Sequence, residues 1–139
     1  MLLCSLLLLI SSSVSFSPIP AFKRSVLRSN VNLFGTKKTF SSFDEMISTY
    51  EEPLFVDFYA DWCGPCQLMS KEVSSLSNTY EGKLKVAKVD TDKYPDLEEK
   101  YKIDGLPTCI LFKKGKEVKR FVGLMKEEEL KPHIEPFLD

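Results

Sequence analysis

The sequence predicts an α/β fold in which a mixed central β-sheet carries helices on both faces. Short apolar runs rich in β-favouring residues alternate with segments of helical periodicity along most of the chain. The last two runs, 108–112 and 117–122, flank a Lys-Lys-Gly-Lys turn and therefore predict a hairpin. Strands joined through helices run parallel and a hairpin adds an antiparallel pair, so the order β-α-β-α-β-α-β-β-α indicates a mixed sheet.

The pattern begins with a short strand and a capped helix. Residues 39–40 are expected to end the first strand. Ser42 and Glu45 match a capping box, in which each side chain satisfies a free amide at a helix start. Apolar residues at helical spacing then predict a first helix over 42–50.

A buried strand and a long helix follow. Residues 54–60 form an apolar, β-favouring run that fits a strand buried on both faces, interrupted by Asp57. From Cys63 the apolar spacing becomes helical until Gly82. The remaining elements are expected to be a strand over 84–89, a helix over 95–101, the two hairpin strands and a last helix over 126–138.

The N-terminal part of the chain differs from the rest in charge. Residues 1–43 contain five basic residues and no Asp or Glu, whereas the remainder carries 14 basic and 20 acidic residues. We therefore expect a cleavable targeting presequence over 1–35, signal-like over 1–15 and transit-like over 16–35, followed by one domain over 36–139. This leader resembles the bipartite presequences of algae with complex plastids, which implies the plastid stroma. The alternative is a plain secretory signal and a lumenal location.

Composition excludes several classes of protein. A formal net charge of −1 gives no indication of nucleic-acid binding, and no segment after the leader is long and apolar enough for a membrane anchor. Without Cys4 of the leader, three cysteines remain, an odd number that argues against a structural disulfide framework. His133 is the single histidine, so we expect no metal and no cofactor.

The segment Trp62-Cys63-Gly64-Pro65-Cys66 carries the predicted chemistry. It lies between the buried strand and the long helix, where free amides and the helix dipole favour an anion. Cys63 is therefore the expected nucleophilic thiolate, and Cys66, one turn inside, is placed to attack its sulfur. Gly64 and Pro65 shape the turn and allow a Cys63–Cys66 disulfide to close. The alternatives are half of a metal site or an idle pair.

Two further residues need an explanation. A carboxylate at Asp57, six residues before Cys63, should be desolvated and should have a raised pKa, which suits a proton acceptor for Cys66. The alternative is a solvated Asp on an edge strand. Cys109 lies among apolar residues and is expected to be a buried, inert thiol, or alternatively a regulatory third cysteine.

The chain resembles the thioredoxin family over about residues 36–138. The motifs that carry the resemblance lie at residues 56–66, 86–90, 106–108, 112–115 and 123. The resemblance implies the thioredoxin fold, with Cys63 attacking, Cys66 resolving and Asp57 as the buried acid. It also implies that Lys88 lies near Asp57, that Pro107 is a cis-proline facing the disulfide, that Leu106 offers backbone hydrogen bonds to an extended substrate, and that Trp62 and Gly123 border the docking surface.

Residues 90–95 and 100–103 look most like the plastid y-type thioredoxins. That type implies electron supply to peroxiredoxins and methionine sulfoxide reductases, after reduction by a ferredoxin- or NADPH-dependent thioredoxin reductase, and we expect a monomer. Two positions depart from the family pattern: Lys71 replaces a kinking proline, and the last helix contains Pro132 and Pro136.

The predicted function is reduction of protein disulfides by the Cys63/Cys66 pair. The Gly-Pro dipeptide between the cysteines favours a reductant, because oxidase and isomerase relatives usually place a His there. The alternatives are a lumenal disulfide oxidase or isomerase, and a non-catalytic interaction module that uses the same fold.

Overall fold

A computed structural model describes residues 40–138, and the structural statements below refer to that part of the chain. The expected presequence, residues 1–35, lies outside it. The elements, in chain order, are α1 (Phe43–Thr49), β1 (Leu54–Tyr59), α2 (Gly64–Thr79), β2 (Lys85–Asp90), α3 (Pro95–Lys100), β3 (Thr108–Lys113), β4 (Lys116–Val122), α4 (Glu127–Ile134) and the 3₁₀ turn η1 (Glu135–Phe137).

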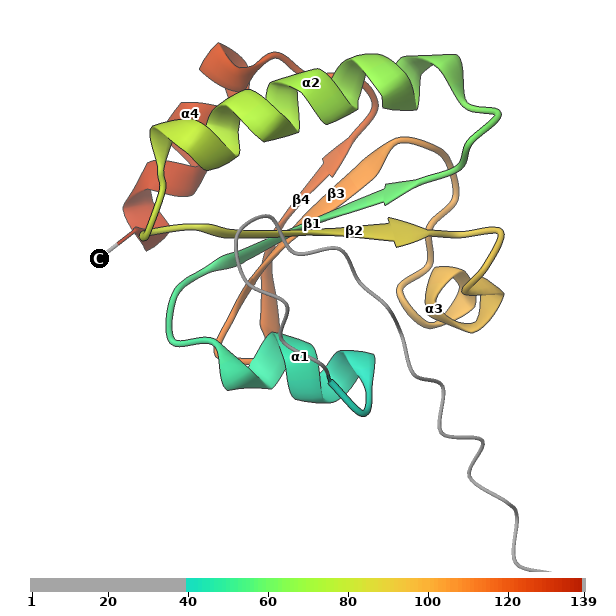
Figure 1. Cartoon of the computed structure of the whole chain (residues 1–139), viewed down its shortest axis with the longest axis horizontal. Coiled ribbons are helices and arrows are strands. Elements are labelled where there is room, and N and C mark those ends of the chain that lie inside the picture. Colours follow the sequence, from blue (N-terminus) through green and yellow to red (C-terminus); the bar gives the residue numbers. More distant parts are fainter. Residues whose placement is uncertain (1–39, 139) are drawn as a thin grey trace, which may run out of the picture.

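The strands form one mixed sheet in the order β2-β1-β3-β4. β1 pairs parallel with β2 and antiparallel with β3, and β3 and β4 form the predicted hairpin. Helices α2 and α4 cover one face and α1 and α3 the other (Figure 1). The predicted α/β architecture with helices on both faces is therefore confirmed, and β1 lies in the interior of the sheet.

The expected first strand is not seen in the described residues. Thr39 lies outside them, and Phe40 is not in a strand. The Phe40 ring is buried and packs edge-on against Tyr50, with ring centroids 5.7 Å apart. Phe40 thus contributes to the core through its ring, and the described order begins with α1.

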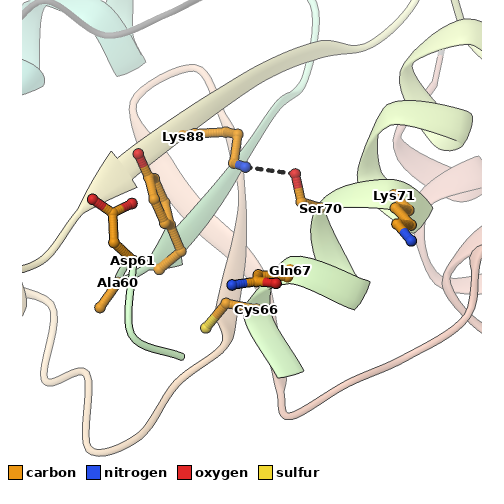
Figure 2. A pocket seen from close by; sticks show the side chains of 8 residues that line it. Ala60, Asp61, Cys66, Gln67, Ser70, Lys71 and Lys88 are labelled. Carbon is orange, nitrogen blue, oxygen red and sulfur yellow. Dashed lines mark hydrogen bonds between the residues drawn. The ribbon is translucent and has the colours of Figure 1, made fainter. Parts of the chain in front are cut away.

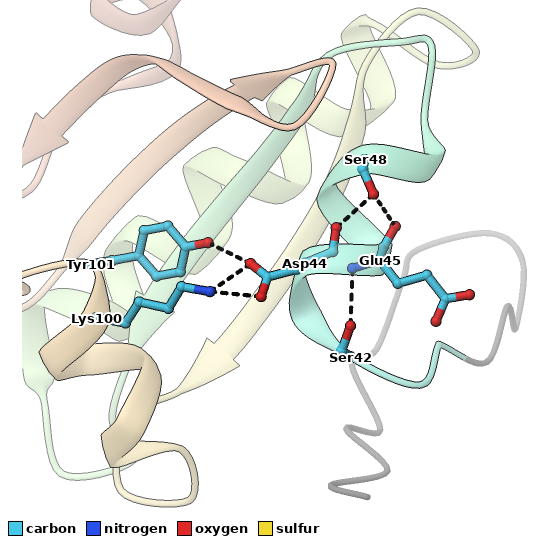
Figure 3. Close-up of polar contacts among 6 residues, drawn as sticks. All are labelled: Ser42, Asp44, Glu45, Ser48, Lys100 and Tyr101. Carbon is cyan, nitrogen blue, oxygen red and sulfur yellow. Dashed lines mark hydrogen bonds and ion pairs between the residues drawn. The ribbon is translucent and has the colours of Figure 1, made fainter. Parts of the chain in front are cut away.

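The predicted cap of α1 forms with one change of partner. The Ser42 hydroxyl accepts a hydrogen bond from the Glu45 N–H at 3.1 Å (Figure 3). The Glu45 carboxylate, however, accepts from the N–H of Ser41 at 2.8 Å, one residue before the position that a capping box uses. Asp44 accepts from Lys100 at 2.6 and 2.7 Å, which ties the start of α1 to the end of α3.

The alternation of β1 sends its side chains into two apolar clusters. Val56 and Phe58 pack in the cluster that includes α1, whereas Phe55 packs with α2 and α4. Each fully buried side chain of this size stabilises the fold by about 1.5–3 kcal/mol. Because strand side chains alternate, Asp57 shares the α2 face with Phe55.

The last helix is not interrupted at Pro132, although a proline inside a helix favours a bend or break there. α4 continues through Pro132 to Ile134 and then tightens into η1. Leu130 and Ile134 are both fully buried, and this anchored face holds the helix together although Pro132 lacks an amide hydrogen. By contrast α2, with Lys71 in place of a proline, runs for 16 residues without a break.

Candidate active site

Cys63 and Cys66 are joined by a disulfide at the start of α2. Cys63 is the N-cap residue, and its sulfur accepts a hydrogen bond from the Cys66 N–H at 3.2 Å. Gly64 begins the helix and Pro65 lies in its first turn, where its missing N–H costs no helical hydrogen bond. After reduction the Cys63 sulfur stands where the free amides and the helix dipole stabilise a thiolate. Cys63 is 5% exposed and Cys66 2%.

The Leu106–Pro107 loop lies beside the disulfide. The Leu106–Pro107 peptide bond is cis, as the resemblance implied. Leu106 packs against the small cluster that contains Cys63 and Cys66. The Gly123 N–H donates to the Pro107 carbonyl at 2.8 Å, and Gly123 has a φ of +88°, which glycine adopts without strain. The three residues predicted to bind substrate thus lie together, and Leu106 among them contacts the cluster that contains the disulfide.

Exposed apolar side chains neighbour Cys63 and Gly123 along the chain. Trp62 is 74% exposed, and Val122 and Leu124 flank Gly123 with their side chains in solvent. The indole Nε1–H of Trp62 donates to Asp92 Oδ2 at 3.1 Å. Sequence reasoning missed Asp92. The sequence did contain an indication of this contact. Parallel β1 and β2 end at the same edge of the sheet, so Asp92, just after β2, is expected near Trp62, just after β1.

Asp57 is fully buried at the centre of the sheet. It is paired in register with Lys88 on β2 and with Cys109 on β3. Because β1 is an interior strand and the Asp57 side chain is 0% exposed, the alternative of a solvated edge residue is excluded. Burial raises the pKa of Asp57 to about 6, although the Lys88 ammonium and the Cys109 thiol both act to lower it.

Cys109 is buried, as expected, but its surroundings are not purely apolar. Its thiol donates a hydrogen bond to Asp57 Oδ1 at 3.5 Å. Burial, and then the nearby Asp57 carboxylate, raise the pKa of the Cys109 thiol well above its ordinary value. Sequence reasoning placed Cys109 in the right strand and missed this contact, because it depends on the register between β1 and β3.

Lys88 lies near Asp57, as the resemblance implied, but its ammonium is closer to Ser70 than to Asp57. Its Nζ is 4.0 Å from Asp57 Oδ2 and donates to the Ser70 hydroxyl at 2.6 Å. The ammonium also lies 4.6 Å from the centre of the Tyr59 ring. Ser70, on α2, is a second residue that sequence reasoning missed.

A solvent-open cleft of about 380 Å³ lies between α2 and the end of β1. Cys66, Ser70 and Lys88 line it, and Figure 2 shows the Lys88–Ser70 contact on its wall. The cleft is therefore open to solvent beside the Cys66 side chain and the ammonium of Lys88.

Within residues 40–138, no three His, Cys, Asp or Glu side chains gather in a way that would hold a metal ion. No helix in the same range combines the length and apolar character needed to cross a membrane.

Comparison with known proteins gives one consistent result. The thioredoxin family profile matches residues 35–136. Thioredoxin Y2, chloroplastic, of Arabidopsis thaliana is 48% identical over 99 residues, 71% of this chain and 59% of that protein. Thioredoxin Y, chloroplastic, of Oryza sativa subsp. japonica is 46% identical over 103 residues, 74% of this chain and 61% of that protein. The chain thus spans about three fifths of the length of these relatives.

Among solved structures, a thioredoxin variant from Halobacterium salinarum NRC-1 is 37% identical, with a TM-score of 0.64. The match covers 72% of this chain and 86% of that one. The similarity thus extends from the sequence to the fold.

Proposed function

Because the chain belongs to the thioredoxin family, we propose that it reduces disulfide bonds in other proteins through Cys63 and Cys66. The observation that carries this proposal is the position of the pair. The Cys63 sulfur caps α2 within a disulfide to Cys66, and Leu106 of the cis-proline loop packs against the cluster that contains both cysteines. A thiolate at a helix N-terminus is a nucleophile, and the adjacent loop offers a backbone edge to a target.

The reaction proceeds by two exchanges. The Cys63 thiolate attacks one sulfur of the target disulfide, whose S–S bond breaks, and the released target sulfur takes up a proton. Cys66 then gives its proton to Asp57 and attacks the Cys63 sulfur, which breaks the mixed disulfide. The target leaves with both cysteines reduced, the Cys63–Cys66 disulfide forms again, and a reductase returns two electrons.

The supporting residues have separate roles in this proposal. An extended segment of the target lies along Leu106 and Pro107, and Trp62 and Gly123 border it. Lys88 stabilises the ionised form of Asp57, since its ammonium is 4.0 Å from the carboxylate. Gly64 and Pro65 keep the two sulfurs within bonding distance across the first helical turn.

The targets proposed are plastid peroxiredoxins and methionine sulfoxide reductases, with a ferredoxin- or NADPH-dependent thioredoxin reductase as donor. The support is the similarity to chloroplastic y-type thioredoxins of two plants. We propose a monomer in the plastid stroma, delivered by a presequence over residues 1–35. A fluorescent fusion of residues 1–40 tests the compartment: plastid fluorescence supports the proposal, and secretory fluorescence contradicts it.

Insulin reduction tests the activity. The wild-type chain should reduce insulin with a dithiol donor, and Cys63→Ser should abolish the reaction. Cys66→Ser should instead accumulate a mixed disulfide through Cys63. Failure of the wild-type protein would indicate a non-catalytic module. A redox potential near that of oxidases, above roughly −180 mV, would indicate the oxidase or isomerase alternative.

A further inference from the structure

Three side chains form a row across the sheet beneath α2. Asp57 of β1 lies between Lys88 of β2 and Cys109 of β3, in register with both. Laterally paired residues project from the same face of a sheet, so all three point toward α2. Asp57 and Cys109 are 0% and 1% exposed, whereas Lys88 reaches the cleft that Cys66 also lines.

The two oxygens of Asp57 have different surroundings. Oδ1 accepts the hydrogen bond from the Cys109 thiol at 3.5 Å. Oδ2 accepts no hydrogen bond from the described residues, and the Lys88 Nζ stands 4.0 Å away, held by Ser70. The oxygen that can take a proton without losing a partner is therefore Oδ2, on the side of Lys88 and the cleft.

Cys109 is suited to a constant donor role. A buried carboxylate oxygen without a hydrogen bond is costly, so the thiol stabilises the ionised Asp57. Because burial and the Asp57 charge raise the pKa of Cys109, the sulfur keeps its hydrogen at neutral pH. The other titratable side chains that interact with Asp57 are Lys88 from β2 and Tyr59 from its own strand, and α2 contributes Cys66 to the adjoining cleft.

We infer that Cys109 is a positioning residue that holds Oδ1 of Asp57 and so directs the proton released by Cys66 to Oδ2. The inference rests on the proposed function. In this step the Cys66 S–H bond breaks, its proton binds Oδ2, and the sulfur keeps the electron pair with which it attacks Cys63. Cys109 keeps its own proton and takes up no electrons in this step. Its hydrogen bond favours the charged carboxylate, so its removal shifts the titration of Asp57 to higher pH.

The direct test is a carbon-13 NMR titration of the Asp57 carboxyl in the full-length oxidised chain. Cys109→Val removes the donor at similar size, and we expect the Asp57 midpoint to rise by about half a pH unit, as a weak hydrogen bond implies. Cys109→Ser keeps a donor and should restore the wild-type midpoint or lower it. Cys109→Ala serves as a second donor-free variant if valine does not fit.

A second readout follows the reaction itself. The pH midpoint for release of a preformed mixed disulfide should move upward with Cys109→Val, by the same amount as the NMR midpoint, and not with Cys109→Ser. Equal shifts in both variants, or no shift in either, would overturn the inference. The titration needs no catalytic activity, so its failure is distinct from a failure of wild-type insulin reduction, which would overturn the proposed function.

Discussion

The ammonium of Lys88 is hydrogen-bonded to the hydroxyl of Ser70 at 2.6 Å. The same ammonium remains 4.0 Å from Asp57 Oδ2, beyond hydrogen-bond distance. Lys88 therefore acts on Asp57 through its charge alone, and burial remains the larger influence on the acid. A residue of α2 thus sets how strongly a lysine of β2 acts on an aspartate of β1.

Ser70→Ala should lower the pKa of Asp57. Without the hydroxyl, the Lys88 ammonium loses its short contact and can approach the carboxylate, whose charged form an adjacent cation favours. We expect the NMR midpoint of Asp57 to fall by about half a pH unit. Ser74→Ala is the matched control, because the Ser74 hydroxyl bonds only the Ser70 backbone carbonyl among the described residues. A rise in the midpoint would show that Ser70 holds the lysine near Asp57.

The sequence predicted the parts of the site that lie close together along the chain. Cys63, Cys66 and the buried strand before them follow from local pattern, because a strand leading into a helix start fixes where a thiolate is favoured. The contacts of Ser70 and Cys109 could not be predicted in the same way. They depend on strand register and on how α2 lies over the sheet, which no spacing within a single element encodes.

The Trp62–Asp92 contact should restrain the exposed indole. Trp62 is the only tryptophan in the chain, so its fluorescence reports this position alone. Asp92→Ala removes the acceptor of the Nε1–H, and we expect a lower steady-state anisotropy and a change in emission maximum. Asp96→Ala, an exposed acid on α3, is the control. Identical spectra for wild type and Asp92→Ala would show that the hydrogen bond does not order the ring in solution.

Glu127 should stabilise the protein fully above about pH 4.5, and progressively less as the pH falls toward 2. Its carboxylate pairs with Lys131 at 2.8 Å and also accepts hydrogen bonds from Ser75 and Thr79, which join α4 to α2. These contacts lower the pKa of Glu127 from 4.5 to about 2, and the hydrogen bond from Lys131 has the largest effect. A lowered folded pKa gives stability that is complete above pH 4.5 and lost as the pH falls through 2.

Glu127→Gln should therefore lower the free energy of unfolding by about 1 kcal/mol above pH 4.5, since the pair is near the surface. The difference from wild type should vanish toward pH 2, where Glu127 itself becomes neutral. Urea denaturation from pH 2 to 7 measures it. Glu128→Gln, at the next and exposed position, should show no such dependence. A constant difference at all pH values would mean that the charge of Glu127 is not responsible.

Asp57→Asn should stabilise the protein at neutral pH and slow its reaction. Burial raises the pKa of Asp57 in the folded state from 3.8 to about 6, so the folded state binds this proton more tightly than the unfolded chain. The contribution of Asp57 to stability is then most favourable below pH 3.8, falls as the pH rises, and levels off above about 6. The loss amounts to about 3 kcal/mol at pH 8, because each pKa unit corresponds to roughly 1.4 kcal/mol. Asn cannot ionise, so the variant avoids this loss of stability.

Two measurements on the same variant separate the structural and the chemical role of Asp57. In urea denaturation, Asp57→Asn should exceed wild type in stability at pH 8 and converge with it near pH 4, whereas Asp104→Asn, an exposed acid, should follow wild type throughout. In single-turnover reduction, Asp57→Asn should release the mixed disulfide more slowly, because the amide cannot accept the proton of Cys66. A variant that is less stable than wild type at pH 8 and reacts at the wild-type rate would contradict both roles. Burial of the carboxylate predicts the gain in stability, and proton acceptance from Cys66 predicts the loss in rate.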